Sequence, residues 1–343
     1  MRAHFPILDQ CVYLNTAYVG LPSTALMDYR TSYDKNYLTE ADHFKIKGYE
    51  RLESQRQTLS SFIGSQYPNT FITPNFSVGF RLFLDFLPSD TRFLILKEDY
   101  PSLETAIRER GFSVEQVPMG PHVEEVIATA LQEGKFDVLA VSVVQYTNGV
   151  CLNQQALANI KKRFPNILIL ADGTQFLGAE LFTFDASPFD LIAASGYKWF
   201  LAGFGNGLVT VNSRFIDYCQ TSFETIAAKV YAGHFDFLGA ASLAFAVRQL
   251  EAWNFPRLVE QKNQTTTYLK KGLEKRELLS PMVQKRKDHA AIFNIAATED
   301  FYQQLLVAGV RCSYRAQGVR ISVHFYNTTE DIDAFFAVYD RLV

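Results

Sequence analysis

The stretch ILILADGTQFLGAELFTFDASPFDLIAASGYKWFLAGFGNGLVTV, residues 167–211, decides the fold of this chain. It contains three apolar runs that are typical of buried strands, at 167–170, 191–194 and 208–211. Asp172-Gly-Thr-Gln175 follows the first run, and Ser195-Gly-Tyr-Lys198 follows the second. Ligands of open α/β sheets bind at the carboxyl ends of parallel strands. We therefore expect a carboxylate and an amine to face one cleft.

The chain has the composition of an ordinary soluble globular protein, with 48% hydrophobic and 20% charged residues among 343. This length allows a large core and two subdomains. The 33 basic and 36 acidic residues give a net charge of −3, so no basic field favours nucleic acid or an anionic membrane. We expect neither as a partner.

The four cysteines, Cys11, Cys151, Cys219 and Cys312, lie far apart and form no CxxC pair. The amino terminus lacks the apolar segment of a signal peptide, and no run approaches the roughly 18 apolar residues of a membrane span. These features predict a cytoplasmic protein with reduced thiols. The six histidines include no HxxxH or HxH spacing, so we expect no metal site.

Apolar runs and helical patterns alternate between residues 70 and 170. Strands are predicted at 70–73, 93–96, 112–117 and 138–144, and helices at 78–87, 102–110, 122–131 and 154–163. Such alternation is the signature of βαβ units and a parallel sheet, and hence of an α/β fold.

The pattern changes after Val211. Helices are predicted at 239–253, 256–276, 299–307 and 330–342, and strands at 290–295, 310–314 and 319–323. We therefore expect an amino-terminal segment and large domain over residues 1–255, and a small α+β domain over residues 256–343.

Lys198 is the first candidate for chemistry. A lysine after a strand is usually a surface amine, but Gly196, Tyr197 and Trp199 are poor neighbours for a surface position. Burial lowers the pKa of a lysine and makes it a nucleophile that forms a Schiff base with a carbonyl. Asp172 alone would be a strand-end cap. Opposite such a lysine, however, a carboxylate can hold the ring nitrogen of pyridoxal phosphate protonated.

These motifs, in this order, resemble the class V aminotransferase family of pyridoxal-phosphate enzymes. The family pattern is D-x-x-Q/H, then S-x-H-K and G-x-G, and this chain has Asp172-x-x-Gln175, Ser195-Gly-Tyr-Lys198 and Gly205-Asn-Gly207. YLNTAYVG, residues 13–20, is similar to the family's substrate-side loop, and residues 318–334 are similar to its closing strand and helix.

The resemblance implies fold type I, with a mostly parallel sheet of the seven-stranded type in a large domain and a small carboxyl-terminal domain. It implies a homodimer with active sites at the interface. The same superfamily includes cysteine desulfurases and enzymes like isopenicillin N epimerase.

The resemblance also implies residue roles around pyridoxal 5′-phosphate. Lys198 would hold the cofactor as a Schiff base and move a proton at the substrate's α-carbon. Asp172 would pair with the ring nitrogen, and Gln175 would lie near the ring hydroxyl. The phosphate would be bound by a strand-end hydroxyl and by a turn that opens a helix, where orphan N–H groups favour an anion. These phosphate ligands would be Ser195, Asn75, Phe76 and Ser77.

Four further positions take roles from the resemblance. Tyr100 would stack on the cofactor ring, although core packing is the simpler alternative. Arg320 would clamp the substrate carboxylate, a task suited to its planar bidentate donor, and its alternative is a surface salt bridge. Thr16 and Ala17, in the substrate-side loop, would contact the substrate.

The chain departs from the family pattern in three places. Tyr197 stands where histidine is usual. Gly233-His234 stands where a Gly-Thr pair often contacts the phosphate across the dimer, so His234 is either a phosphate donor or an ordinary interface residue. Gln145 or Tyr146 occupies the place of an asparagine near the ring hydroxyl.

The cysteines argue against persulfide-forming desulfuration. Cysteine desulfurases carry a thiolate on a mobile loop just before the closing strand, whereas residues 310–318 here run straight from one strand into the next. Cys312 is expected mid-strand, as an inert core thiol.

We therefore predict an aminotransferase acting on a small amino acid. A lyase of the cysteine desulfurase or selenocysteine lyase kind and an epimerase are the alternatives. A non-catalytic binding protein of the same fold would be expected to lack Lys198 or Asp172, and both residues are present.

Overall fold

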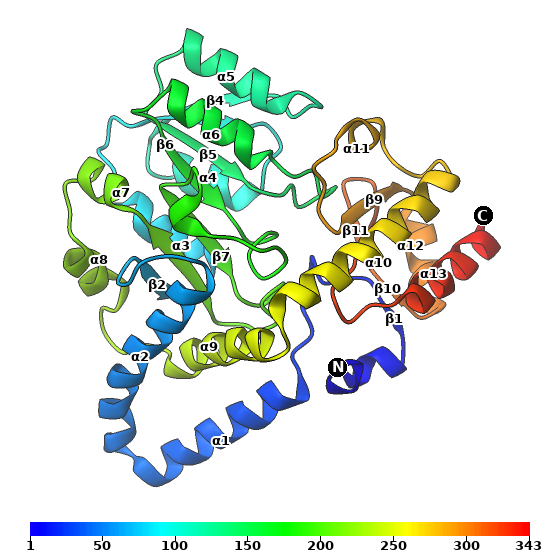
Figure 1. The fold of residues 1–343 in the computed structure, drawn as a ribbon, viewed down its shortest axis with the longest axis horizontal. Coiled ribbons are helices and arrows are strands. Elements are labelled where there is room, and N and C mark those ends of the chain that lie inside the picture. Colours follow the sequence, from blue (N-terminus) through cyan, green and yellow to red (C-terminus); the bar gives the residue numbers. More distant parts are fainter.

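A seven-stranded sheet forms the centre of the larger part of the molecule (Figure 1), in a computed structural model that describes all 343 residues. The strand order is β2-β8-β7-β6-β5-β3-β4. The strands are β2 (Thr70–Thr73), β3 (Arg92–Leu96), β4 (Ser113–Val117), β5 (Val138–Ser142), β6 (Leu168–Asp172), β7 (Leu191–Ser195) and β8 (Gly207–Val211). Only β8 runs opposite to the others. The expected mostly parallel α/β sheet is confirmed.

The sheet is buried on both faces, which explains why its strands are continuous apolar runs. In β6, Leu168 and Leu170 point into one apolar cluster, whereas Ile169 and Ala171 point into another. Four helices pack on the first face: α3 (Phe76–Leu84), α4 (Pro101–Arg108), α7 (Ser213–Tyr218) and α8 (Phe223–Val230). The second face is covered by α5 (Val123–Glu133), α6 (Gln154–Arg163) and α9 (Phe237–Ala252).

A second, three-stranded antiparallel sheet, in the order β11-β12-β9, lies in the carboxyl-terminal part of the chain. Its strands are β9 (Ile292–Ala296), β11 (Ser313–Arg315) and β12 (Gly318–Ser322). The helices of this part are α10 (Phe255–Lys275), α11 (Pro281–Lys285), α12 (Glu299–Val307) and α13 (Thr329–Leu342). The proposed division at residue 255 coincides with the start of α10, and it stays a prediction.

Cys312 lies between two strands and not within one, which corrects its expected mid-strand position. It follows β10 (Val310–Arg311), which pairs with β1 (Val12–Tyr13), and precedes β11, which pairs with β12. The chain changes its pairing partner at Cys312, so the ladder is interrupted there. The thiol is nevertheless buried, with 3% of the residue exposed.

The amino-terminal segment joins distant parts of the chain. Two short 3-10 helices, η1 (Arg2–His4) and η2 (Pro6–Asp9), precede β1, which lies beside the carboxyl-terminal strands. The long helices α1 (Thr24–Glu40) and α2 (Asp42–Phe62) then extend away from the sheet (Figure 1) and pack on α9. A third 3-10 helix, η3 (Phe184–Ala186), precedes β7.

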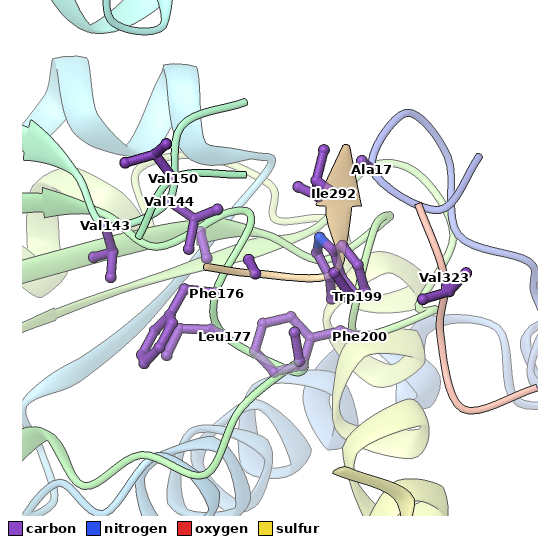
Figure 2. Close-up of a cluster of buried hydrophobic side chains, with 14 of the residues drawn as sticks. Ala17, Val143, Val144, Val150, Phe176, Leu177, Trp199, Phe200, Ile292 and Val323 are labelled. Carbon is purple, nitrogen blue, oxygen red and sulfur yellow. The ribbon is translucent and has the colours of Figure 1, made fainter. Parts of the chain in front are cut away.

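The segment after β7 is fixed by an apolar cluster in which Trp199 and Phe200 lie near Phe176 and Ile292 (Figure 2). Because Ile292 begins β9, this cluster ties the two sheets together directly beside Lys198. No helix of the structure has both the length and the apolarity needed to cross a bilayer.

Candidate active site

Polar side chains end three neighbouring strands of the large sheet. Ser142 ends β5, Asp172 ends β6 and Ser195 ends β7, and Ser142 and Asp172 are register partners. All three line a cavity of about 590 Å³, and Lys198 lines the same cavity. The carboxylate and the amine that the sequence predicted for one cleft are therefore brought together.

Lys198 is a buried amine, with 7% of the residue exposed. Its Nζ lies 5.8 Å from the centroid of the Tyr100 ring and 5.5 Å from that of Tyr197. Burial lowers the pKa of Lys198 to about 8, an effect that the negative charge of Asp172 partly offsets. A substantial neutral fraction therefore exists near neutral pH, as a nucleophile or a general base requires.

The lowered pKa of Lys198 gives a testable pH dependence. An amine reacts only after losing its proton, so a lower pKa moves the rise in reactivity to lower pH. We expect trace labelling of the apoprotein by acetic anhydride to rise at Lys198 with a midpoint near pH 8. The labelled peptides would be quantified by mass spectrometry.

The exposed Lys135 serves as the control for the labelling of a surface amine in the same samples. In Asp172→Asn the midpoint of Lys198 should fall further, because the charge that stabilises the ammonium is removed. A Lys198 midpoint at the ordinary lysine value of roughly 10.4 would contradict this account.

Asp172 is a buried carboxylate with an unusual second carboxylate nearby. One of its oxygens accepts a hydrogen bond from the Thr174 N–H at 2.8 Å. Burial raises the pKa of Asp172, while Thr174 and Lys198 act in the opposite direction. The negative charge of Asp99 raises the pKa of Asp172 further. Asp99 lies just beyond β3 and accepts hydrogen bonds from the Ser142 and Tyr100 N–H groups at 2.9 and 2.7 Å.

The start of α3 lines one end of the cavity, with backbone N–H groups of the kind that an anion would need. Asn75 caps the helix by accepting from the Val78 N–H at 2.9 Å, and the Phe76 N–H donates to Ser195 Oγ at 3.0 Å. A Cβ on Gly207 would come within 2.5 Å of the Ala194 oxygen and 3.0 Å of the Asn75 Cα, so glycine is needed for this close approach. The predicted phosphate ligands thus lie together, with the orphan N–H groups of a helix terminus.

Ser77 also belongs to this end of the cavity, which it lines. Its hydroxyl accepts a hydrogen bond from Ser102 Oγ at 2.7 Å, so the first turns of α3 and α4 are linked.

Gln175 lines the cavity, but its amide is engaged elsewhere. Its Oε1 accepts from Trp199 Nε1 at 2.7 Å, and its Nε2 donates to the Ala17 oxygen at 2.9 Å. Gln175 therefore connects the lysine segment to the substrate-side loop. Its role near a ring hydroxyl stays a prediction.

The substrate-side loop is fixed by residues from the carboxyl-terminal part of the chain. Thr16 Oγ1 hydrogen-bonds the hydroxyl of Tyr326, and the Ala17 N–H donates to Ser322 Oγ at 2.9 Å. Tyr18 and Val19, not Thr16 and Ala17, line the cavity. The substrate contacts predicted for Thr16 and Ala17 stay predictions, and their observed contacts position the loop.

Gly20 is where this loop meets the lysine segment. Its N–H donates to the Tyr197 oxygen at 2.9 Å. A Cβ at this position would come within 1.8 Å of the Lys198 backbone oxygen. Only glycine allows the loop to pack so closely on the lysine backbone.

Arg320 is a buried guanidinium without an acidic partner. Only 3% of the residue is exposed, and its Nη1 donates to the Tyr146 backbone oxygen at 2.6 Å. Burial and the neighbouring charge of Arg315 lower the pKa of Arg320 to about 10. The surface salt bridge considered as its alternative is not formed. An unpaired buried cation is a ready site for an anion.

The remaining predicted positions differ in how close they lie to the cavity. The rings of Tyr100 and Tyr146 meet edge to face at 5.5 Å, and both line the cavity. Gln145 is buried and lines an adjoining cleft of about 1120 Å³, which Tyr146 also lines. His234 is exposed in the loop between α8 and α9 and does not line the cavity.

The cavity fits an aromatic cofactor that carries a phosphate. The start of α3 and Ser195 offer donors to an anion, while Asp172 offers a charge to a protonated ring nitrogen. Ser142, on the far side of Asp172 from Ser195, also lines the cavity, and its Oγ is buried without a hydrogen-bond partner within the chain. Such an orphaned polar atom is consistent with a bound polar group, and pyridoxal phosphate matches this set of donors and acceptors.

Four lining residues that carry a hydroxyl group were not predicted as site residues: Tyr18, Ser142, Thr174 and Tyr197, the last noted only as a departure. Ser142 could have been found by the rule that singled out Asp172, because it also ends a buried strand. Tyr18 belongs to the predicted substrate-side loop, but which residues of that loop reach the cavity depends on contacts with distant residues.

The chain matches known proteins over nearly its whole length. A probable cysteine desulfurase of Pyrococcus abyssi is 21% identical, over 100% of this chain and 97% of that protein. The apo structure of a cysteine desulfurase from Thermococcus onnurineus NA1 is 17% identical with a TM-score of 0.82, over 100% of this chain and 97% of the other. The structure of the cystine C-S lyase C-DES with cysteine persulfide is 17% identical with a TM-score of 0.87, over 98% of both chains.

At these identities the two structures show a shared fold, which confirms the expected fold type I. The family match is more specific. Residues 23–335 match the family described as Aminotransferase class-V, and they include every predicted site residue except Thr16 and Ala17. The chain belongs to the class V aminotransferase family.

Proposed function

We propose that the chain is a carbon–sulfur lyase that cleaves the Cβ–S bond of a small amino acid and uses pyridoxal 5′-phosphate as its cofactor. The observation that carries this proposal is a cavity with a desolvated amine, Lys198, beside Asp172 and no thiol in its walls. The similarity to a probable cysteine desulfurase and to the fold of a cystine C-S lyase favours sulfur amino acids. The lyase function, which the sequence analysis gave as an alternative, therefore replaces the aminotransferase as the leading proposal.

The residues around the cavity would hold the cofactor at both ends. Ser195 and the first N–H groups of α3 would bind its phosphate, Asp172 its ring nitrogen, and the Tyr100 ring would lie against it. When bound, pyridoxal phosphate withdraws electrons from the substrate's α-carbon.

Each of the other residues then has a defined task. Arg320 would hold the α-carboxylate and so fix which bond of the α-carbon faces Lys198. The Nζ of Lys198 would take the α-proton and return a proton to the departing sulfur. The rings of Tyr100 and Tyr197, which flank Nζ, would exclude water from this proton transfer.

The overall elimination is balanced without an external oxidant or reductant. With L-cystine and water as reactants, the products are cysteine persulfide, pyruvate and ammonia. The Cβ–S bond breaks, the sulfur leaves with its electron pair and gains a proton, and the remaining aminoacrylate is hydrolysed.

The thiols of the chain support elimination over sulfur transfer to the protein. None of the four cysteines lines the cavity. Burial raises the pKa of Cys151, Cys219 and Cys312 to about 12, so these thiols are protonated at neutral pH. Burial also raises the pKa of Cys11, so none of the four thiols is activated to attack the substrate's sulfur.

The aminotransferase function is the second candidate, because Lys198, Asp172 and Arg320 would serve both reactions. Epimerisation would use the same three groups. We further propose a homodimer, in which His234 would approach the partner's phosphate. The exposed apolar side chains of the projecting helices α1 and α2 support this, since Tyr37, Leu38 and Ile46 are 59%, 82% and 60% exposed.

The products of the holoenzyme distinguish the candidates. With L-cystine we expect pyruvate and ammonia in equal amounts, by lactate dehydrogenase and glutamate dehydrogenase assays, without any keto-acid acceptor. The control is L-alanine, which has no leaving group at Cβ. An aminotransferase would instead convert a panel of amino acids only when a keto acid is added. An epimerase would scramble the α-centre without releasing ammonia.

A further inference from the structure

The hairpin of β11 and β12 carries two arginines on one face. Ser313 lies directly opposite Arg320 in the ladder, and Arg315 is two residues beyond Ser313 on the same strand. Arg315 is therefore a diagonal neighbour of Arg320, at a Cα separation of roughly 7–8 Å in such pairs. The connecting turn is Ala316-Gln317, with positive φ values of 47° and 55°, as in the tight two-residue hairpins that fix register.

Neither Arg315 nor Arg320 forms an ion pair with a carboxylate of the chain. Arg320 donates only to a backbone oxygen. The exposed Arg315 lies over the ring of Tyr18, with its Cζ 5.4 Å from the ring centroid. Two like charges on one rigid hairpin repel each other, so the pair is stabilised by a ligand with two negative charges.

Arg315 does not line the active-site cavity itself, but it contacts a residue of the cavity wall. The side chain beneath it, Tyr18, lines that cavity. The positive charge of Arg315 also acts to lower the pKa of Lys198 and of Tyr100, which line the cavity, and of Arg320, which donates to the cavity-lining Tyr146. Together with the contact on Tyr18, this places the guanidinium close enough to the cavity for a ligand that extends past Tyr18 to reach it.

We propose that Arg315 binds a second carboxylate at the far end of the substrate, while Arg320 binds the α-carboxylate. The substrate class is therefore a β-sulfur amino acid with a distal carboxylate, of which the disulfide cystine is the simplest symmetrical case. Cysteine itself leaves Arg315 without a partner. This inference rests on the proposed lyase function and adds the substrate class to it.

In the absence of substrate, Arg315 packs on the ring of Tyr18, and a substrate carboxylate can replace this contact. A cation–π contact at an exposed site is weak compared with a bidentate guanidinium–carboxylate pair. Arg315 can therefore leave the Tyr18 ring when a carboxylate arrives. The pair with the substrate is partly shielded by the same ring.

The test uses two disulfides that differ only in the distal carboxylate. L-Cystine has it, whereas the mixed disulfide of L-cysteine and cysteamine lacks it. We expect the wild-type holoenzyme to prefer cystine by about 10- to 100-fold in kcat/KM, mainly through KM, because a hydrogen-bonded charge pair contributes an effect of this size. In Arg315→Gln the preference should fall below about threefold, and Arg315→Lys should restore part of it.

Arg311→Gln is the matched control, since Arg311 is an exposed arginine on the neighbouring β10 but, unlike Arg315, has no cation–π contact with a residue that lines the cavity. It should keep the wild-type preference. A wild-type enzyme that cleaves both disulfides equally well would overturn the inference, and so would an Arg315→Gln variant that retains the preference.

A binding measurement separates failure of this inference from failure of the proposed function. The probe is 3,3′-dithiodipropionate, which has both carboxylates but no amine and cannot react. By calorimetry, the wild-type holoenzyme should bind it at least about tenfold more tightly than 3-(methyldithio)propionate, and Arg315→Gln should not. If neither disulfide yields pyruvate, the lyase function alone is refuted. If the wild-type holoenzyme binds the two probes with equal affinity, the role of Arg315 is refuted.

Discussion

The Lys198→Ala holoenzyme is expected to lose at least about 10³-fold in kcat/KM for its amino-acid substrate, because general acid–base and nucleophilic roles would be removed together. The buried Nζ between Tyr100 and Tyr197 is the one amine that lines the cavity. No other group there can replace it. The measurement is the rate of pyruvate release, with Lys135→Ala as an exposed-lysine control that should match the wild type.

A spectroscopic result accompanies the loss of turnover. Borohydride reduction followed by peptide mapping should find the pyridoxyl group at Lys198 in the wild type and nowhere in Lys198→Ala. A yellow chromophore that remains covalently attached to Lys198→Ala would show that another amine holds the cofactor.

Asp172→Ala is expected to lower kcat/KM by about 10²- to 10³-fold, the size typical of losing one preorganised electrostatic group in a site shielded from water. Asp172 is 5% exposed and ends β6 beside Lys198, where its charge would keep the cofactor's ring nitrogen protonated. Cofactor affinity should fall as well. Both quantities can be measured on one preparation, by pyruvate release and by fluorescence titration with pyridoxal phosphate.

Asp172→Asn separates charge from shape, since it keeps the size of the side chain and should lose almost as much activity as Asp172→Ala. The exposed Asp217→Ala is the control for removal of a carboxylate elsewhere. An Asp172→Ala enzyme that retains more than about a tenth of the wild-type kcat/KM would contradict the assigned role.

The strand-end residues show how much of the site could be predicted from the sequence. Burial on both faces makes β6 and β7 continuous apolar runs, so their ends can be found by inspection. Asp172, Ser195 and Lys198 follow directly from those ends, and the structure brings them to one cavity. The predicted helices at 154–163 and 299–307 have the observed bounds, because each lies between clear turn residues.

Other parts of the site could not be predicted because they depend on contacts between distant segments. Gln175 lines the cavity as expected for a residue near the cofactor, but the contacts of its amide with Trp199 and Ala17 could not be foreseen. Tyr18 reaches the cavity only because its loop is held by Ser322 and Tyr326. Cys312 was placed within a strand, since local apolarity cannot reveal where a chain changes its pairing partner.

The same loop has a consequence for how the protein is made. The hydrogen bond from Ala17 to Ser322 joins residues 305 positions apart, so residues 13–20 leave the ribosome long before their partners exist. Contacts of such high sequence separation form late in folding. The nascent chain can assemble the large sheet first, but the loop beside Lys198 settles only when β12 has been synthesised. Completion of the active site is thereby coupled to completion of the polypeptide.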